Sequence, residues 1–91
     1  MTEEPLRTLV VDDSSSMRGL LRELLCERHH QVTVLGSAEE GLRAHIEKPF
    51  QLMLVDWTLP GMSGLDLCRA VRARPGGEQV FILMITARNK V

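Results

Sequence analysis

The stretch Leu6-Arg-Thr-Leu-Val-Val11 becomes fully apolar toward its end and stops at Asp12-Asp13. The stretch Gln51-Leu-Met-Leu-Val55 repeats this pattern and stops at Asp56. A short apolar run that ends abruptly in acidic residues is typical of a buried parallel strand whose carboxyl end reaches a polar edge. We therefore predict that both stretches are strands of one parallel sheet.

The rest of the chain alternates between helical and strand patterns. Apolar residues recur at helical spacing from Met17 to Leu25, as Met17, Leu20, Leu21, Leu24 and Leu25, and this first helix should end near residues 28–29. Ser37-Ala-Glu-Glu40 matches a capping box, in which Ser37 and Glu40 each bond a backbone N–H at the start of a helix. The other predicted elements are a strand over 32–35, the end of the second helix at about residue 48, a third helix from about residue 65 to the break at 75–77, and a fourth strand over 80–85.

Strands that alternate with helices over short connections predict a doubly wound α/β fold with a parallel sheet. Right-handed crossovers favour the strand order 2-1-3-4, with the first helix on one face and the second and third helices on the other. Ligands of such sheets bind where the strand order reverses, at the carboxyl ends of the first and third strands. The same layout leaves the fourth strand with an apolar face and an open edge, which predicts self-association through residues 80–85.

Length, composition and charge restrict the class of protein. The 91 residues suit one small domain, and 44% hydrophobic with 25% charged residues is typical of a folded chain. The formal charge of −1 and the lack of a basic run argue against direct binding to nucleic acid. No membrane span or basic leader is present, so we expect a cytoplasmic protein that does not contact membrane.

Asp12, Asp13 and Asp56 should converge at the switch point of the sheet. Clustered carboxylates repel one another unless a cation or a proton shares the site. All-oxygen ligands select a hard cation, and a few carboxylates with open positions suit Mg²⁺. The alternative interpretation is that the three residues are solvated caps of strand ends.

Three motifs together resemble the receiver domain of two-component response regulators, which has a flavodoxin-like fold. They are Val10-Val-Asp-Asp13-Ser, Leu54-Val-Asp56-Trp-Thr-Leu-Pro60-Gly-Met-Ser-Gly64 and Ile85-Thr86-Ala87. Their order and spacing match the family over essentially the whole chain.

The resemblance implies a function and a role for each motif. Asp56 would accept a phosphoryl group from a histidine kinase or phosphotransfer protein, with Mg²⁺ held by Asp12, Asp13, Asp56 and the backbone carbonyl of Thr58. Thr86 would contact the bound phosphoryl group and couple it to a change of the surface. The chain would then be a signalling module and not an enzyme.

The resemblance also predicts missing elements. Receiver domains usually continue into a fourth helix, a fifth strand that ends in a phosphoryl-binding lysine, and a fifth helix. We therefore expect residues 1–91 to be a single receiver-like domain that is incomplete at its C-terminus. Lys90 lies only four residues after Thr86, so the role of that lysine is not assigned to it.

Two other functional classes are alternatives. One is a receiver-like binding or dimerisation module that no longer switches. The other is a different enzyme on the same sheet. A phosphatase of the haloacid dehalogenase type would need a second aspartate two residues after its nucleophile, and position 14 is Ser14. A flavodoxin would need a phosphate-binding loop rich in Ser, Thr and Gly after the first strand, where Asp12 and Asp13 would repel the phosphate.

Overall fold

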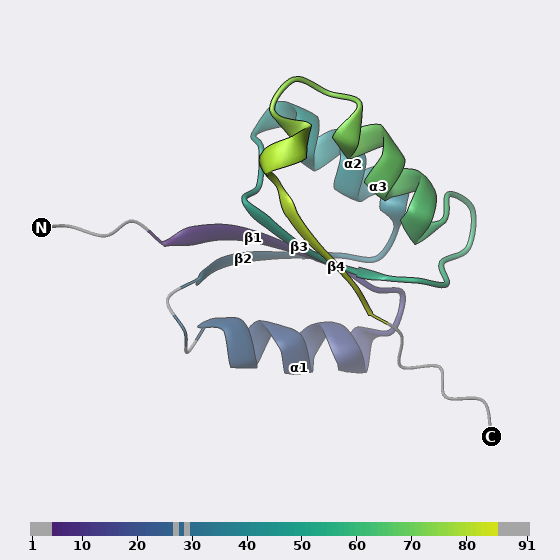
Figure 1. Cartoon of the computed structure of the whole chain (residues 1–91). Coiled ribbons are helices and arrows are strands. Elements are labelled where there is room, and N and C mark those ends of the chain that lie inside the picture. Colours follow the sequence, from purple (N-terminus) through teal and green to yellow (C-terminus); the bar gives the residue numbers. More distant parts are fainter. Residues whose placement is uncertain (1–4, 27, 29, 86–91) are drawn as a thin grey trace, which may run out of the picture.

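The computed structural model describes residues 5–26, 28 and 30–85. Its strands and helices alternate along the chain (Figure 1). In chain order the elements are β1 (Leu6–Val11), α1 (Ser15–Cys26), β2 (His30–Leu35), α2 (Ala38–Glu47), β3 (Leu52–Asp56), α3 (Gly64–Arg72), the short 3₁₀ helix η1 (Gly77–Gln79) and β4 (Phe81–Ile85).

The four strands form one parallel sheet in the order β2-β1-β3-β4, as predicted. In register, Val11 of β1 lies beside Leu35 of β2 and Val55 of β3, and Asp56 lies beside Ile85 of β4. The carboxyl ends of all four strands therefore lie along the same edge of the sheet. The strand order reverses between β1 and β3 at this edge, which is where α/β sheets bind ligands.

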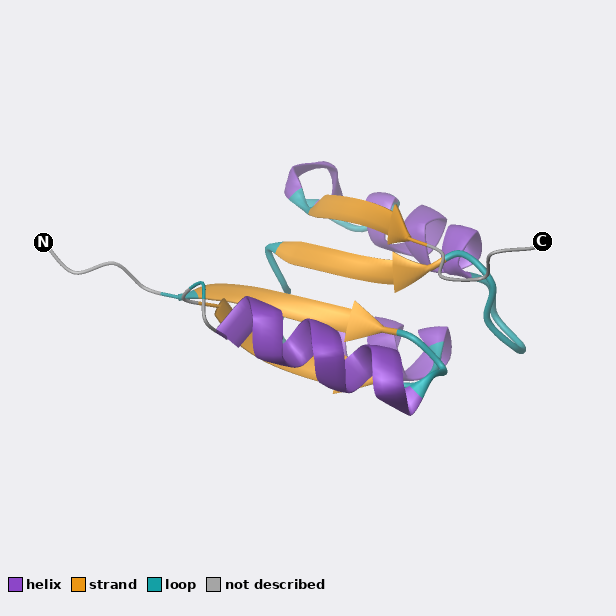
Figure 2. Cartoon of the chain, turned by 90° about the horizontal axis from the view of Figure 1, so that it is seen from below, coloured by secondary structure: helices purple, strands orange, loops and turns teal. Residues whose placement is uncertain are grey.

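The helices cover the two faces of the sheet as the crossover rule predicts. Helix α1 lies on one face, along β1 and β2, and α2 and α3 lie together on the other face (Figures 1 and 2). The main core fills the space between α2, α3 and the sheet. Its fully buried members are Leu9, Val11, Ala38, Met53, Val55, Leu67 and Val71.

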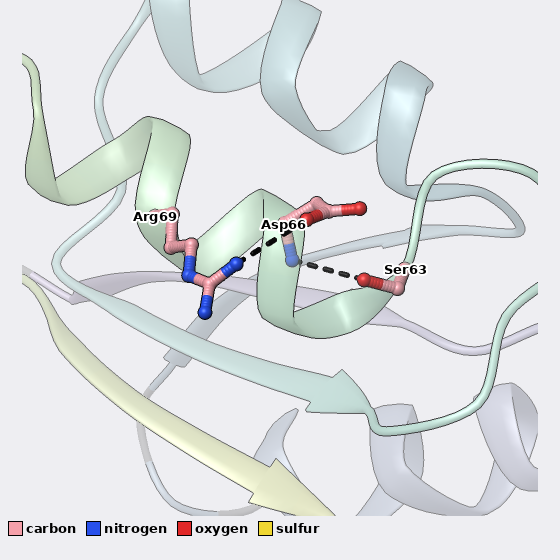
Figure 3. Close-up of polar contacts among 3 residues, drawn as sticks. All are labelled: Ser63, Asp66 and Arg69. Carbon is pink, nitrogen blue, oxygen red and sulfur yellow. Dashed lines mark hydrogen bonds and ion pairs between the residues drawn. The ribbon is translucent and has the colours of Figure 1, made fainter.

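The α-helices α1, α2 and α3 each begin at a serine whose hydroxyl accepts a backbone N–H. The Ser14 Oγ accepts from Met17, the Ser37 Oγ from Glu40 and the Ser63 Oγ from Asp66. Figure 3 shows the last of these contacts, with Arg69 placed one turn further along α3. The predicted cap at Ser37 is thus confirmed. These caps fix where the chain turns from each strand or loop into the next helix.

The face of the sheet that carries α1 is less completely covered. The predicted apolar stripe of α1 faces the sheet only in part, because Leu20 and Leu24 are about half exposed. On β4, Ile82 and Met84 pack against the main core, whereas Phe81 is 65% exposed and Leu83 is 43% exposed. The apolar face predicted for the fourth strand is therefore present among the described residues. None of the described helices is both long and apolar enough to cross a membrane.

Candidate functional site

Asp12, Asp13 and Asp56 meet at the carboxyl edge of the sheet. A carboxylate oxygen of each residue lies within 4.8 Å of one from each of the others. Asp12 and Asp56 are buried, with 2% of their surfaces exposed, whereas Asp13 is exposed. The predicted convergence of the three residues is confirmed. Two acidic side chains are thus held inside the protein while the third lies at the surface.

Hydrogen bonds between strands fix the backbone on which two of these side chains stand. The N–H of Asp12 donates to the carbonyl of Leu35 on β2, 3.1 Å away. The N–H of Trp57, directly after Asp56, donates to the carbonyl of Ile85 on β4 at 2.7 Å. Ladder bonds of this kind continue the sheet past Val11 and Asp56. The spacing between Asp12 and Asp56 is therefore set by the sheet and not by flexible loops.

Each buried carboxylate also organises the turn that follows it. The Oδ1 of Asp12 accepts the N–H of Ser14 at 2.9 Å, and the Oδ1 of Asp56 accepts the N–H of Thr58 at 3.2 Å. This contact from an aspartate to the backbone two residues later is a common way of starting a turn. On the other side, the Arg18 guanidinium of α1 donates to the backbone carbonyl of Asp12 at 2.7 Å. The carboxylates are thus oriented by their own loops.

The loop over residues 57–63 leads from Asp56 into α3, and α3 begins in direct contact with the phosphoacceptor candidate. A Cβ atom placed on Gly64 would collide with the backbone carbonyl oxygen of Asp56 and would lie 3.0 Å from Val55 Cγ1. Only glycine permits this approach, because any side chain would have to displace a strand backbone. The first turn of α3 therefore supports the end of β3 from one side.

The donor set at this edge matches one kind of metal. Three carboxylates supply only oxygen ligands, which favour a hard divalent cation over zinc or copper. Like charges within 4.8 Å also repel, and a bound cation relieves that repulsion. Mg²⁺ binds through one or two carboxylates, retains several waters and tolerates a partly exposed site. Asp12, Asp13 and Asp56 are the side chains that could hold it.

The other two predicted site residues are placed less fully. Thr58 follows Asp56 by two residues, and its N–H donates to the Asp56 carboxylate. That its backbone carbonyl is a ligand of Mg²⁺ stays a prediction. Thr86 follows the last residue of β4 and lies outside the described residues, as does Lys90.

One contact beside the site was not foreseen from the sequence. The Oε2 of Glu39 in α2 accepts the N–H of Met62 in the 57–63 loop, 3.0 Å away. This backbone hydrogen bond lowers the pKa of the Glu39 carboxyl below its ordinary value. The capping box is a local pattern, and it points to Glu40 as the acidic residue at the start of α2. A contact across 23 residues leaves no such local signal.

Comparison with known proteins identifies what this arrangement resembles. Residues 8–91 match the family described as the response regulator receiver domain. The phosphate regulon transcriptional regulatory protein PhoB of Rhizobium meliloti (strain 1021) is 40% identical over 82 residues, which are 89% of this chain and 36% of that protein. The chain thus spans about a third of the length of that relative.

A shorter relative and a solved structure match over more of their own length. The chemotaxis protein CheY of Pseudomonas aeruginosa is 38% identical over 89 residues, which are 93% of this chain and 69% of that protein. The structure of the chemotaxis response regulator CheY4 of Vibrio cholerae superposes with a TM-score of 0.87 at 27% identity, covering 94% of this chain and 72% of that one. Both matches cover more than nine-tenths of this chain.

Proposed function

This chain belongs to the response regulator receiver domain family, and we propose that it accepts a phosphoryl group on Asp56 in a Mg²⁺-dependent reaction. The observation that carries the proposal is the convergence of Asp12, Asp13 and Asp56 at the switch point of the sheet. The donor would be a phosphohistidine of a histidine kinase or phosphotransfer protein. Residues 1–91 would act as one receiver unit.

Each residue at the carboxyl edge would have a separate task. A carboxylate oxygen of Asp56 would attack the phosphorus, forming an O–P bond while the bond from phosphorus to the donor's leaving atom breaks. Asp12, Asp13, Asp56 and the Thr58 carbonyl would hold Mg²⁺, which neutralises negative charge on the transferring group when it is bound. Thr86 would donate its hydroxyl to the bound phosphoryl group. The rigid strand ends would keep Asp56 in line with the donor.

The proposed role is that of a signalling module in the cytoplasm and not of an independent enzyme. In such a role the partner supplies the phosphoryl group, and the chain contributes a nucleophile, metal ligands and a surface that changes. Direct contact with nucleic acid is not part of the proposal, because the net charge of the chain is −1.

The test is phosphorylation by a small-molecule phosphodonor in the presence of Mg²⁺, followed by intact-protein mass spectrometry. We expect the wild-type chain to gain one acid-labile phosphoryl group and Asp56→Asn to gain none. Asp66→Asn is the matched control, since Asp66 is an exposed carboxylate on α3. Equal phosphorylation of wild type and Asp56→Asn would assign the acceptor to another residue.

The exposed face of β4 favours a second candidate, a binding or dimerisation module that does not switch. Among the described residues β4 is the last strand of the sheet, and Phe81 and Leu83 on it are exposed. Large apolar side chains left in water forfeit about 1.5–3 kcal/mol each, which favours pairing of β4 with a second copy of the chain. Sedimentation of the 91-residue chain tests this, and a monomer that persists at high concentration would contradict it.

A further inference from the structure

The loop over residues 57–63 joins the candidate phosphoacceptor to α3, and its two ends are held differently from its middle. At its start, the Thr58 N–H bonds to Asp56. At its end, the Ser63 hydroxyl caps α3 by accepting the Asp66 N–H at 3.0 Å (Figure 3). Between them, Leu59 is 8% exposed and belongs to the main core. Near its end the loop is also held by the Met62 N–H, which donates to Glu39.

The shape of the loop accommodates the Glu39 carboxylate closely. Gly61 has a φ of 73°, in the left-handed region that favours glycine. A Cβ atom on Gly61 would lie 2.8 Å from Glu39 Oε2 and 3.6 Å from its Cδ. The carboxylate therefore rests on the bare Cα side of Gly61 while it accepts the N–H of the next residue. Two neighbouring loop residues thus contact the same glutamate.

Glu39 itself stands on a rigid support. Its neighbour Ala38 is fully buried, and Ser37 caps the helix. Gly41, half a turn further along α2, packs so closely that an added Cβ would lie 3.0 Å from Val11 Cγ2 on β1. Helix α2 is therefore fixed against β1, the strand that leads into Asp12 and Asp13. Glu39 connects this strand and helix to the loop that follows Asp56.

We propose that Glu39 is a positioning residue for the Asp56 site, because its carboxylate holds the 57–63 loop in the conformation that binds metal. This role rests on the proposed function. Thr58, the predicted carbonyl ligand, lies four residues before Met62 in the same loop. If the loop were not fixed, each binding event would have to order it, and that ordering would weaken binding. The hydrogen bond to Glu39 holds the loop in this conformation before the metal binds.

Three variants separate this role from alternatives. Glu39→Ala removes the acceptor, whereas Glu39→Gln removes the charge but keeps an oxygen that can accept the Met62 N–H. Glu40→Ala is the matched control, since Glu40 is the next residue of the same helix turn. Its contact with Ser37 is made by the backbone N–H, which the substitution keeps. Mg²⁺ affinity is measured by the fluorescence of Trp57, which is 53% exposed beside Asp56. Exchange of the Met62 amide proton reports directly on the loop.

Glu39→Ala should weaken Mg²⁺ binding about two- to ten-fold, the value of one ordinary hydrogen bond, and should speed exchange of the Met62 amide. Glu39→Gln and Glu40→Ala should stay near wild type in both measurements. Equal Mg²⁺ affinity in wild type and Glu39→Ala would overturn this role alone. A loss in Glu39→Gln as large as in Glu39→Ala would also overturn it, because charge and not the hydrogen bond would then be responsible. Absence of any Mg²⁺ response in the wild-type chain would instead overturn the proposed function, and this role with it.

Discussion

The two edges of the sheet hold charged side chains in opposite ways. At the amino edge, Arg7 donates to the backbone carbonyls of Lys48 and Pro49, and Arg72 donates to those of Gly77 and Val80. At the carboxyl edge, three carboxylates stand within 4.8 Å of one another. The arginines donate hydrogen bonds to backbone carbonyls of the connecting segments, which places these positive charges next to acceptors. The carboxylates place like charges together, which opposes folding and favours a cation.

This difference separates stability from function. Substitutions at the amino edge should lower the free energy of unfolding and leave the chemistry intact. Removal of a charge at the carboxyl edge should abolish the chemistry and leave the fold as stable as before, or more so.

Asp56→Asn should lose all phosphorylation without losing stability. The amide is not a nucleophile, but it retains an oxygen that can accept the Thr58 N–H and it removes one of three repelling charges. Thermal unfolding without divalent cation should therefore occur at the wild-type temperature or above it. A marked fall in that temperature would show that the Asp56 charge is part of what holds the fold together.

Gly64→Ala should destabilise the fold by about 1–3 kcal/mol, because the new methyl group meets the Asp56 carbonyl at the start of α3. Gly19→Ala is the matched control within α1, where an added Cβ meets no atom within 4 Å. That substitution should stabilise the chain by about 0.5–1 kcal/mol. Urea denaturation of both variants measures the contrast, and equal effects would refute the close approach of α3 to Asp56.

Arg72→Ala should destabilise the fold by about 1–2 kcal/mol, because the Gly77 and Val80 carbonyls before β4 each lose the hydrogen bond from Arg72. Arg69→Ala should change stability by less than about 0.5 kcal/mol, since Arg69 is exposed and its ion pair with Asp66 spans 3.9 Å at the surface. Mg²⁺ affinity should be unchanged in both. A loss of Mg²⁺ binding in Arg72→Ala would show that the two edges are coupled.

The smallest effect concerns the pH dependence of stability at the amino edge. His45 is buried, and its Nδ1 accepts the Phe50 N–H at 3.1 Å, which requires this nitrogen to carry no proton. Burial, with a smaller contribution from the nearby Arg74 charge, lowers the pKa of His45 below its ordinary value of 6.5. The unfolded chain then binds the proton more tightly, so His45 supports the fold above pH 6.5 and this support declines as the pH falls below it.

Urea denaturation between about pH 5 and pH 7.5 checks this dependence. His45→Gln removes the titrating group, and its stability should change less with pH over this range. An identical pH dependence in the two proteins would exclude His45 as the source.

Local patterns in the sequence were sufficient to predict most of the fold and the acidic cluster. Apolar runs that end in aspartate identified β1 and β3, and the handedness of the crossovers then determined the strand order. Once that order is known, Asp12, Asp13 and Asp56 must meet. This part was predictable because each step depends on neighbours in the chain or on a general rule.

The contacts that were not predicted join residues without a shared pattern. Glu39 and Met62 are 23 residues apart, and either Glu39 or Glu40 could have faced the loop. The spacing of leucines in α1 shows one apolar side, but not how much of it the sheet covers, so the exposure of Leu20 and Leu24 was missed. Such details depend on the exact separation of packed elements.

The most direct test of the division between the two edges is the Mg²⁺ dependence of thermal unfolding in wild type and Asp13→Asn. Asp13 is the exposed member of the cluster, so its substitution disturbs packing least. At a Mg²⁺ concentration ten times the dissociation constant, the wild-type chain should gain about 1.4 kcal/mol of stability. Asp13→Asn should gain much less at that concentration, with sodium chloride of equal ionic strength as the control. An equal gain in both proteins would contradict the assignment of the carboxyl edge as a cation site.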